Sequence, residues 1–246
     1  MGAAVREAIA EGVVTRDQVH VTSKLSPYEL GAPRAAAACA ALLERLGLGY
    51  VDLVLVHWPG AARQPPASPA HATARRETWR VLEDFHRAGA FREIGVSNFE
   101  RRHLEELLAY CHVRPAANQV ECHPRWPQTQ LRQFCLEAGV AVIAYGSFGA
   151  GALLAPGAAP ELDAVAARAG ATPAQLLLRW GLQKGCHVIP KSVRLDRVAE
   201  FCEVAAAAAA GGETRYLSVE DEALLDSMGE PLDRRKKYCW DPAGVA

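Results

Sequence analysis

Short apolar segments alternate with longer amphipathic segments along this chain of 246 residues, and this alternation restricts the folds open to it. Successive strand candidates begin about 25–45 residues apart, which leaves room for a helix in each connection. The segment 51–56, VDLVLV, is almost continuously apolar, as expected of a strand covered on both faces. We therefore predict repeated βα units and a parallel sheet. The predicted strands are 19–24, 51–57, 93–97, 117–121, 140–145 and 187–190, with a weaker seventh at 214–217.

The number of units favours a closed barrel. Eight βα units make a (β/α)8 barrel of about 250 residues, and seven predicted strands are recognisable here. An open, doubly wound sheet is the alternative, but no G-x-G-x-x-G loop follows the first predicted strand. Thr172 followed by Pro173 predicts a helix N-cap with proline at the first helical position. We predict a single α/β barrel domain over residues 1–246, with a loop over the active site at 60–73, a low-complexity insertion at 205–212 and a tail at 232–246.

The composition indicates a globular protein that can bury a large core. The chain has 27 Lys and Arg against 28 Asp and Glu, and half of its residues are hydrophobic. This balance gives no electrostatic reason to expect nucleic acid or a membrane surface as a partner. No apolar run has the length of a membrane span. The seven cysteines contain no C-x-x-C pair, so we expect reduced thiols, no metal site and a cytoplasmic location.

Polar residues follow the predicted strands, where a barrel places its functional groups. Several of these segments, in this order, resemble the aldo-keto reductase family: VTSKL at 21–25, LVHWP at 55–59, IGVSNF at 94–99, NQVECHP at 118–124 and IPKS at 189–192. The ending YCWDP at 238–242 also resembles the family's tail. The resemblance implies an NADPH-dependent oxidoreductase, expected as a monomer, that reduces aldehydes or ketones to alcohols by hydride transfer from the nicotinamide. Its partner would be a small-molecule carbonyl substrate.

The resemblance gives three residues a place beside the substrate. Lys24 would be the buried ammonium that stabilises negative charge and lowers the pKa of a proton donor, a chemistry that carbonyl reduction requires. His57 would donate a hydrogen bond from a neutral imidazole to the substrate carbonyl. Trp58 would form a wall of the substrate pocket, although a core tryptophan is an alternative for this position.

The resemblance also implies contacts to the nicotinamide half of NADPH. Ser97, Asn98 and Gln119 would hold the carboxamide, since amide side chains offer both a donor and an acceptor. Asn98 could instead be the N-cap of a helix starting near residue 100. Tyr145 would stack against the nicotinamide ring. Ser147 would contact the pyrophosphate, although Gly146 departs from the family pattern, in which Ser directly follows the Tyr.

A third group would hold the adenosine half and its 2′-phosphate. Lys191, Ser192 and Arg197 match members of the family that prefer NADP, because a near-dianion binds best to Lys and to the forked guanidinium of Arg. The N-terminus of the helix that follows also favours an anion. Glu200 matches a family contact to adenine, but Phe201 stands where the family usually has Asn, so adenine would bind more loosely or by stacking.

The family's catalytic Asp and Tyr match no position of this sequence. In the family they precede a helix that the first nine residues resemble, so we expect them upstream of Met1, together with the first strand and the N-terminal hairpin of the barrel. Apolar residues at 5, 9, 13 and 14 recur at helical spacing with no N-cap before them. Activity of the chain as written is therefore in doubt. The alternative function is a non-catalytic, NADPH-binding regulatory or sensor protein.

Overall fold

The structure of the protein is a computed structural model, which describes residues 1–210 and 217–246. Its contacts divide the chain into two compact units, which we describe separately. The first unit contains Met1–Asn118, Glu137–Val140 and Pro242–Ala246. The second contains Gln119–Leu136 and Ala141–Asp241.

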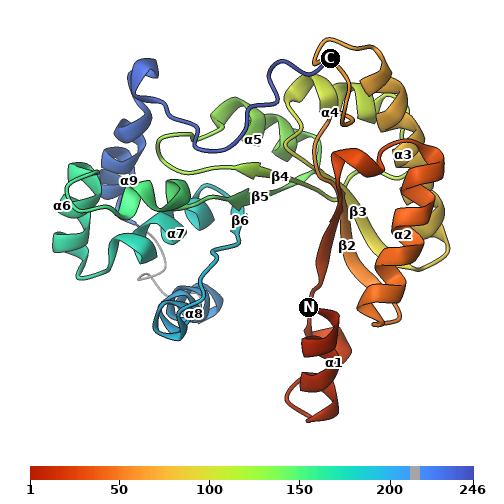
Figure 1. The fold of residues 1–246 in the computed structure, drawn as a ribbon. Coiled ribbons are helices and arrows are strands. Elements are labelled where there is room, and N and C mark those ends of the chain that lie inside the picture. Colours follow the sequence, from red (N-terminus) through yellow and green to blue (C-terminus); the bar gives the residue numbers. More distant parts are fainter. Residues whose placement is uncertain (211–216) are drawn as a thin grey trace. The chain divides into compact units, whose positions relative to one another are not determined.

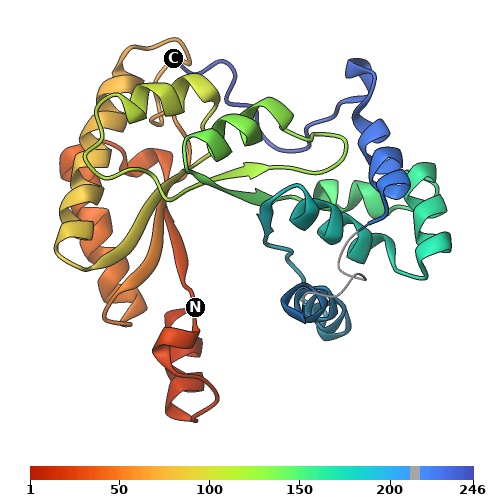
Figure 2. The same cartoon turned by 180° about the vertical axis from the view of Figure 1, so that it is seen from behind.

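The first unit is built on three parallel strands that lie side by side in chain order: β1 (Thr22–Leu25), β2 (Val51–Val56) and β3 (Phe91–Ser97). Every residue of β2 is buried, as its apolar sequence predicts. Helices α2 (Ala32–Leu46) and α3 (Ala70–Arg87) pack side by side along these strands in both Figures 1 and 2. The other helices of this unit are α1 (Gly2–Ala10), α4 (Arg101–Leu108) and the short 3-10 turns η1 (Arg16–Gln18) and η2 (Pro27–Glu29).

The C-terminal residues of the chain also pack in the first unit. The Ala246 backbone N–H donates to Pro66 O at 2.8 Å, and the Ala246 oxygen accepts from Arg75 Nη1 at 2.7 Å. His103 Nε2 lies 3.0 Å from Val245 O. The bond to Pro66 connects the chain end to the segment 60–73, predicted as a loop over the active site. The prediction of a loop across 60–73 is wrong for its last residues, because α3 begins at Ala70.

The second unit continues the βα pattern. Strand β4 (Ala117–Glu121) crosses the boundary between the units, and β5 (Ala141–Tyr145) pairs in parallel with β6 (Cys186–Val188). The Thr172 N-cap is confirmed: its hydroxyl accepts from Gln175 N at 3.2 Å at the start of α7. The helices are α5 (Thr129–Glu137), α6 (Pro160–Ala169), α7 (Pro173–Gln183), α8 (Leu195–Ala210) and α9 (Val219–Asp226), with 3-10 turns η3 (Gly149–Leu154), η5 (Ser227–Gly229) and η6 (Leu232–Arg234).

The predicted strands agree with the structure except at their ends. The strand predicted at 187–190 is shorter and lies one residue earlier, at Cys186–Val188. The weak seventh candidate falls largely on residues 214–216, outside the described part of the chain. The N-terminal helical pattern was extended too far, because α1 ends at Ala10 and Gly12 adopts a positive φ of 72°. Residues 205–210 of the low-complexity segment continue α8, and 211–212 lie outside the described residues.

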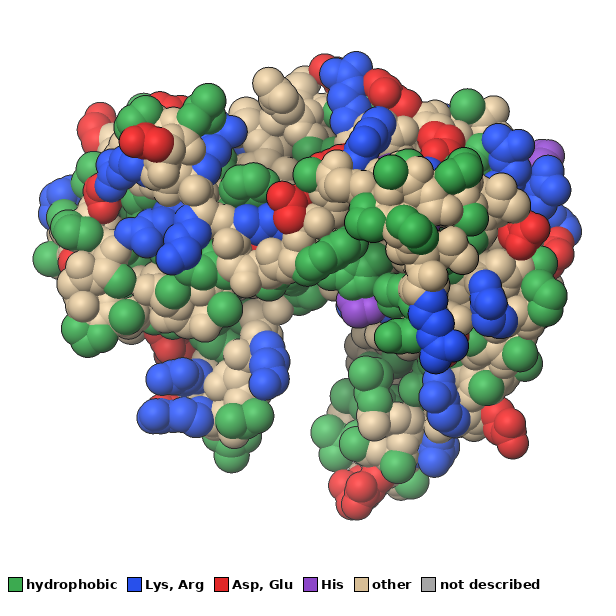
Figure 3. Space-filling model, turned by 45° about the horizontal axis from the view of Figure 1, so that its top comes forward, with side chains coloured by type: hydrophobic (Ala, Val, Ile, Leu, Met, Phe, Trp, Pro, Cys, Tyr) green, Lys and Arg blue, Asp and Glu red, His purple; other side chains and the backbone are tan. Residues whose placement is uncertain are grey.

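Charged side chains of both signs are interspersed over the face shown in Figure 3, in keeping with a net charge of −1. Within the described residues, no helix combines the length and the apolar character that crossing a membrane requires.

Candidate active site

Lys24 and His57 lie at the carboxyl ends of neighbouring strands of the first unit. Lys24 pairs with Leu55 in the register of β1 and β2, and the His57 backbone N–H donates to Leu25 O at 2.9 Å just past the end of β2. Both side chains are half-buried. Burial lowers the pKa of Lys24, and burial together with the Lys24 ammonium lowers the pKa of His57. The imidazole is therefore neutral at neutral pH, the form that can donate to a carbonyl oxygen.

Replacing Lys24 with methionine is expected to raise the pKa of His57, because the neighbouring positive charge disappears while the burial of the ring is kept. The pKa is read from an NMR titration of the histidine ring protons, with the His57 signal assigned from His57→Gln. Arg45→Met removes an exposed charge from α2 and serves as the control. An unchanged or lower pKa in Lys24→Met would show that the two groups do not interact.

Three further predicted residues of the first unit contact or neighbour His57. The ring of Trp58 lies 5.8 Å from the His57 ring at an interplanar angle of 30°. Asn98 Nδ2 donates to His57 O at 3.0 Å and to Ser97 Oγ at 3.1 Å. Asn98 adopts a positive φ of 59°, which Asn tolerates better than most residues. The structure thus brings Lys24, His57, Trp58, Ser97 and Asn98 together at the carboxyl ends of three adjacent strands.

The alternative reading of Asn98 as a helix N-cap is wrong. The N-cap of α4 is Glu100, whose backbone N–H donates to His103 Nδ1 at 3.2 Å. Asn98 lies two residues earlier, and its amide group bonds toward the end of β2 instead. Its conformation therefore depends on the active-site end of the sheet rather than on the helix.

Gln119 lies inside a strand, whereas Ser97 ends β3 and Asn98 follows it directly. Gln119 is the third residue of β4, which continues to Glu121, and it is buried. The residue before it, Asn118, has a structural role: its amide donates to Phe99 O at 2.9 Å and accepts from Phe99 N at 3.4 Å. This pair of bonds fixes the turn that follows β3.

In the second unit, Tyr145 ends β5 and Ser147 follows it within a tight turn. Burial raises the pKa of Tyr145, and the neighbouring Cys239 and Glu121 raise it further, so the phenol stays protonated. Gly146 has a positive φ of 67°, which a glycine adopts without strain. The Ser147 hydroxyl is buried and has no hydrogen-bond partner among the described residues. A buried hydroxyl of this kind is available to a ligand or to a water.

A cavity of about 230 Å³ in the second unit is lined by three of the four predicted adenosine-binding residues, Lys191, Arg197 and Glu200. Arg197 lies in the first turn of α8, as predicted, whereas Lys191 lies three residues beyond the end of β6 because that strand is short. The Glu200 carboxylate accepts a hydrogen bond from the Thr172 hydroxyl. The rings of Phe148 and Phe201 lie 5.5 Å apart at 35°. The lining residues are Phe148, Leu154, Thr172, Pro173, Ala174, Lys191, Arg197, Glu200 and Phe201.

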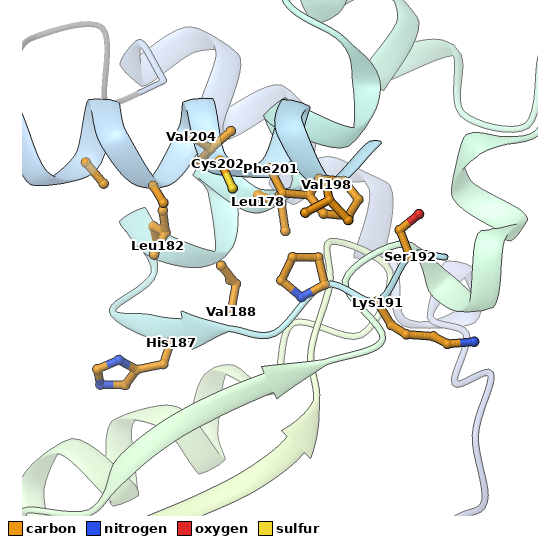
Figure 4. Close-up of a pocket in the computed structure, with 13 residues that line it drawn as sticks. Leu178, Leu182, His187, Val188, Lys191, Ser192, Val198, Phe201, Cys202 and Val204 are labelled. Atoms are coloured by element: carbon orange, nitrogen blue, oxygen red, sulfur yellow. The ribbon is translucent and has the colours of Figure 1, made fainter. Parts of the chain in front are cut away.

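Ser192 is placed differently from Arg197. Its hydroxyl accepts from the Arg194 backbone N–H at 3.0 Å, and it lines a second, mostly apolar cavity of about 690 Å³ formed by α7, β6 and α8. Figure 4 shows Leu178, Val188 and Val204 gathered in this cavity, while the Lys191 side chain extends away from them. The cationic end of Lys191 therefore faces away from the apolar part of this cavity.

The sequence reasoning missed Glu121, a fully buried carboxylate at the end of β4. It accepts hydrogen bonds from the backbone of Tyr238 and Cys239 and from Lys237. The signal in the sequence is a lone acidic residue in an otherwise uncharged buried strand, ANQVE, since an unpaired carboxylate is almost never fully buried.

Comparison with known proteins agrees with this arrangement. The sequence profile of the aldo/keto reductase family matches residues 3–209. A glyoxal reductase of Bacillus subtilis is 38% identical over 196 residues, which are 80% of this chain and 66% of that protein. An uncharacterized oxidoreductase of the same organism, YtbE, is 36% identical over 204 residues, 83% of this chain and 68% of the relative.

Solved structures are similar as well. An aldo-keto reductase in complex with NADPH superposes with a TM-score of 0.80 at 32% identity, covering 100% of this chain and 71% of that one. A Bombyx mori aldo-keto reductase in complex with NADP gives a TM-score of 0.76 at 31% identity, covering 92% and 73%.

The chain therefore belongs to the aldo/keto reductase family of oxidoreductases. This assignment confirms the predicted α/β barrel class and rejects the doubly wound alternative. The chain spans about two thirds of the length of the curated relatives that it matches.

Proposed function

We propose that this chain binds NADPH and belongs to an enzyme that reduces a small aldehyde or ketone, acting as a cytoplasmic monomer. The observation that carries the proposal is the pair of cations, Lys191 and Arg197, on one cavity of the second unit. A 2′-phosphate is a near-dianion, and a guanidinium and an ammonium bind it far better than they bind a ribose hydroxyl. The solved relatives that contain NADPH or NADP support the choice of cofactor.

The residues present fit this cofactor. The cavity of about 230 Å³ is smaller than a whole dinucleotide needs and suits its adenosine end, where Glu200 would contact the adenine by its match to the family. The unpaired hydroxyl of Ser147 fits an acceptor such as a phosphate oxygen. By their match to the family, Ser97, Asn98 and Gln119 would orient the carboxamide, Tyr145 would stack on the nicotinamide ring, and Ser192 would contact the adenosine half.

The chemistry of this chain's own residues follows from their environments. NADPH, when bound, supplies the hydride. His57 is held neutral and would orient the carbonyl by donating a hydrogen bond, while Lys24 would stabilise the negative charge that develops on the carbonyl oxygen. Trp58 would form one side of the substrate pocket. No residue of this sequence matches the family's catalytic Asp or Tyr, so no residue is assigned as proton donor to the alkoxide.

The test is NADPH oxidation with a panel of short aldehydes and ketones. If the chain turns over, His57→Leu, which cannot donate a hydrogen bond, is expected to lower kcat by about 10²–10³, the usual effect of losing a donor to a developing oxyanion. NADPH binding without turnover would favour the second candidate, a non-catalytic NADPH-binding regulatory protein. Folded protein with neither binding nor turnover would contradict both.

Replacing Phe201 with alanine is expected to weaken NADPH and NADH equally, by roughly 5–100-fold, if the Phe148–Phe201 pair stacks on the adenine. The two cofactors share this base and differ only in the 2′-phosphate, so NADH is the internal comparison. The dissociation constants are measured by fluorescence titration. A loss confined to NADPH would contradict stacking on the base.

A further inference from the structure

The buried carboxylate of Glu121 holds the C-terminal tail of the second unit. Glu121 is 0% exposed, and its oxygens accept from Tyr238 N at 2.7 Å and Cys239 N at 3.0 Å. Lys237 Nζ and His123 Nε2 each lie 3.1 Å from it. Burial alone would raise the pKa of Glu121, but these donors together lower it to about 2, so the group is ionised at physiological pH.

The same tail residues pack against the turn that follows β5. A Cβ added at Gly149 would lie 2.7 Å from Cε2 of the Tyr238 ring, so the ring rests directly on this glycine. Tyr238 also lies 5.4 Å from the His123 ring, and its hydroxyl lies 3.4 Å from Arg125 Nη1. The Lys236 backbone N–H donates to Arg125 O at 2.9 Å. The tail is thus fixed between the turn after β4 and the turn after β5.

Cys239 of the tail lies beside the tyrosine that is proposed to stack on the cofactor. The Cys239 thiol hydrogen-bonds with Tyr145, and together with burial it raises the pKa of that phenol. The turn that Tyr238 covers, residues 146–149, contains Ser147 with its unpaired hydroxyl. One carboxylate therefore connects the tail to both parts of this unit that are proposed to contact the nicotinamide and the pyrophosphate.

We propose that Glu121 is a positioning residue: it ties tail residues 237–239 to Tyr145 and to the 146–149 turn, so that the tail acts as a strap that slows the release of NADPH. This inference rests on the proposed function. A carboxylate suits the task because it accepts two backbone N–H groups and an ammonium at once, which a neutral side chain cannot match. Because the anchor lies next to the binding residues, its loss should act mainly on the dissociation rate.

Two adjacent lysines provide a matched test. Lys237 contacts Glu121, and its side chain is only 10% exposed, whereas Lys236 is exposed and its Nζ lies over the Tyr238 ring. NADPH dissociation is followed by stopped-flow fluorescence for the whole chain and for Glu121→Gln, Lys237→Met and Lys236→Met, with circular dichroism as the check of folding. We expect NADPH to dissociate from both Glu121→Gln and Lys237→Met about tenfold faster, or more, than from the unaltered chain. Its dissociation rate from Lys236→Met should stay within about twofold of that of the unaltered chain.

A second readout reports on the tail directly. Trypsin should cut after Arg234 and Arg235 faster in Glu121→Gln and Lys237→Met than in Lys236→Met, and NADPH should slow the cut in the unaltered chain. If Glu121→Gln does not fold, Lys237→Met still removes the contact between Lys237 and Glu121, and it does so from the partner that is less buried. Saturable NADPH binding with equal dissociation rates in Lys237→Met and Lys236→Met would overturn this inference alone. No NADPH binding by the unaltered, folded chain would overturn the proposed function as well.

Discussion

Replacing Arg197 with leucine is expected to weaken NADPH binding about 10–100-fold and to leave NADH binding unchanged. Hydrogen bonds to a charged group contribute about 1.5–3 kcal/mol each, and the 2′-phosphate is the group that only NADPH carries. Arg197 lies on the 230 Å³ cavity in the first turn of α8, where the helix N-terminus adds to the attraction for an anion. Dissociation constants for both cofactors are measured by fluorescence titration at fixed salt, because screening weakens such contacts.

Arg194 provides the matched control for this prediction. It lies three residues earlier, forms an exposed ion pair with Asp196 at 2.6 Å, and is not among the residues that line the cavity. Arg194→Leu should change the affinity for either cofactor less than about twofold, since exposed ion pairs contribute little. An equal loss for NADPH and NADH in Arg197→Leu would mean that the residue supports the fold rather than the phosphate.

Acidification from pH 7 to pH 4 is expected to destabilise the first unit by roughly 3 kcal/mol through His103. Burial lowers the pKa of His103 to about 4, although its bond to the Val245 carbonyl opposes this shift. His103 therefore takes up a proton near pH 4 in the folded chain, whereas it does so near pH 6.5 in the unfolded chain. The stability that depends on a neutral His103 is therefore fully present above pH 6.5 and is lost as the pH falls toward 4.

Urea unfolding at several pH values checks the His103 prediction. His103→Gln keeps a side chain that can accept from Glu100 N in the helix cap but cannot take up a proton, so its stability should depend less on pH. The control is His112→Gln, whose ring is 80% exposed and which should keep the pH dependence of the unaltered chain. Equal pH dependence in His103→Gln and the unaltered chain would contradict the assignment.

Local pattern was sufficient to predict most of the framework. Runs such as 51–56 are apolar enough to identify a buried strand, and Thr172-Pro173 specifies a helix start by side-chain chemistry alone. Lys24 and His57 lie at the carboxyl ends of their strands, where a barrel places polar residues. Lys191 was misplaced relative to its strand, since β6 is only three residues long and nothing in the sequence marks its end.

The remaining features depend on contacts between distant parts of the chain. Asn98 was open to two readings because its left-handed backbone and its bond to His57 O are set by the neighbouring strand, not by the helix that follows. Glu121 was missed because its partners lie in the tail, far along the sequence. In the same way, the sequence near His103 gives no sign that Val245 packs against it.

The most direct test of NADPH binding is a titration of the purified, folded chain with NADPH, followed by tryptophan fluorescence, with NADH as the comparison. We predict saturable binding of NADPH in clear preference to NADH, because Lys191 and Arg197 would hold the 2′-phosphate within the second unit. No binding, or equal affinity for the two cofactors, would contradict it.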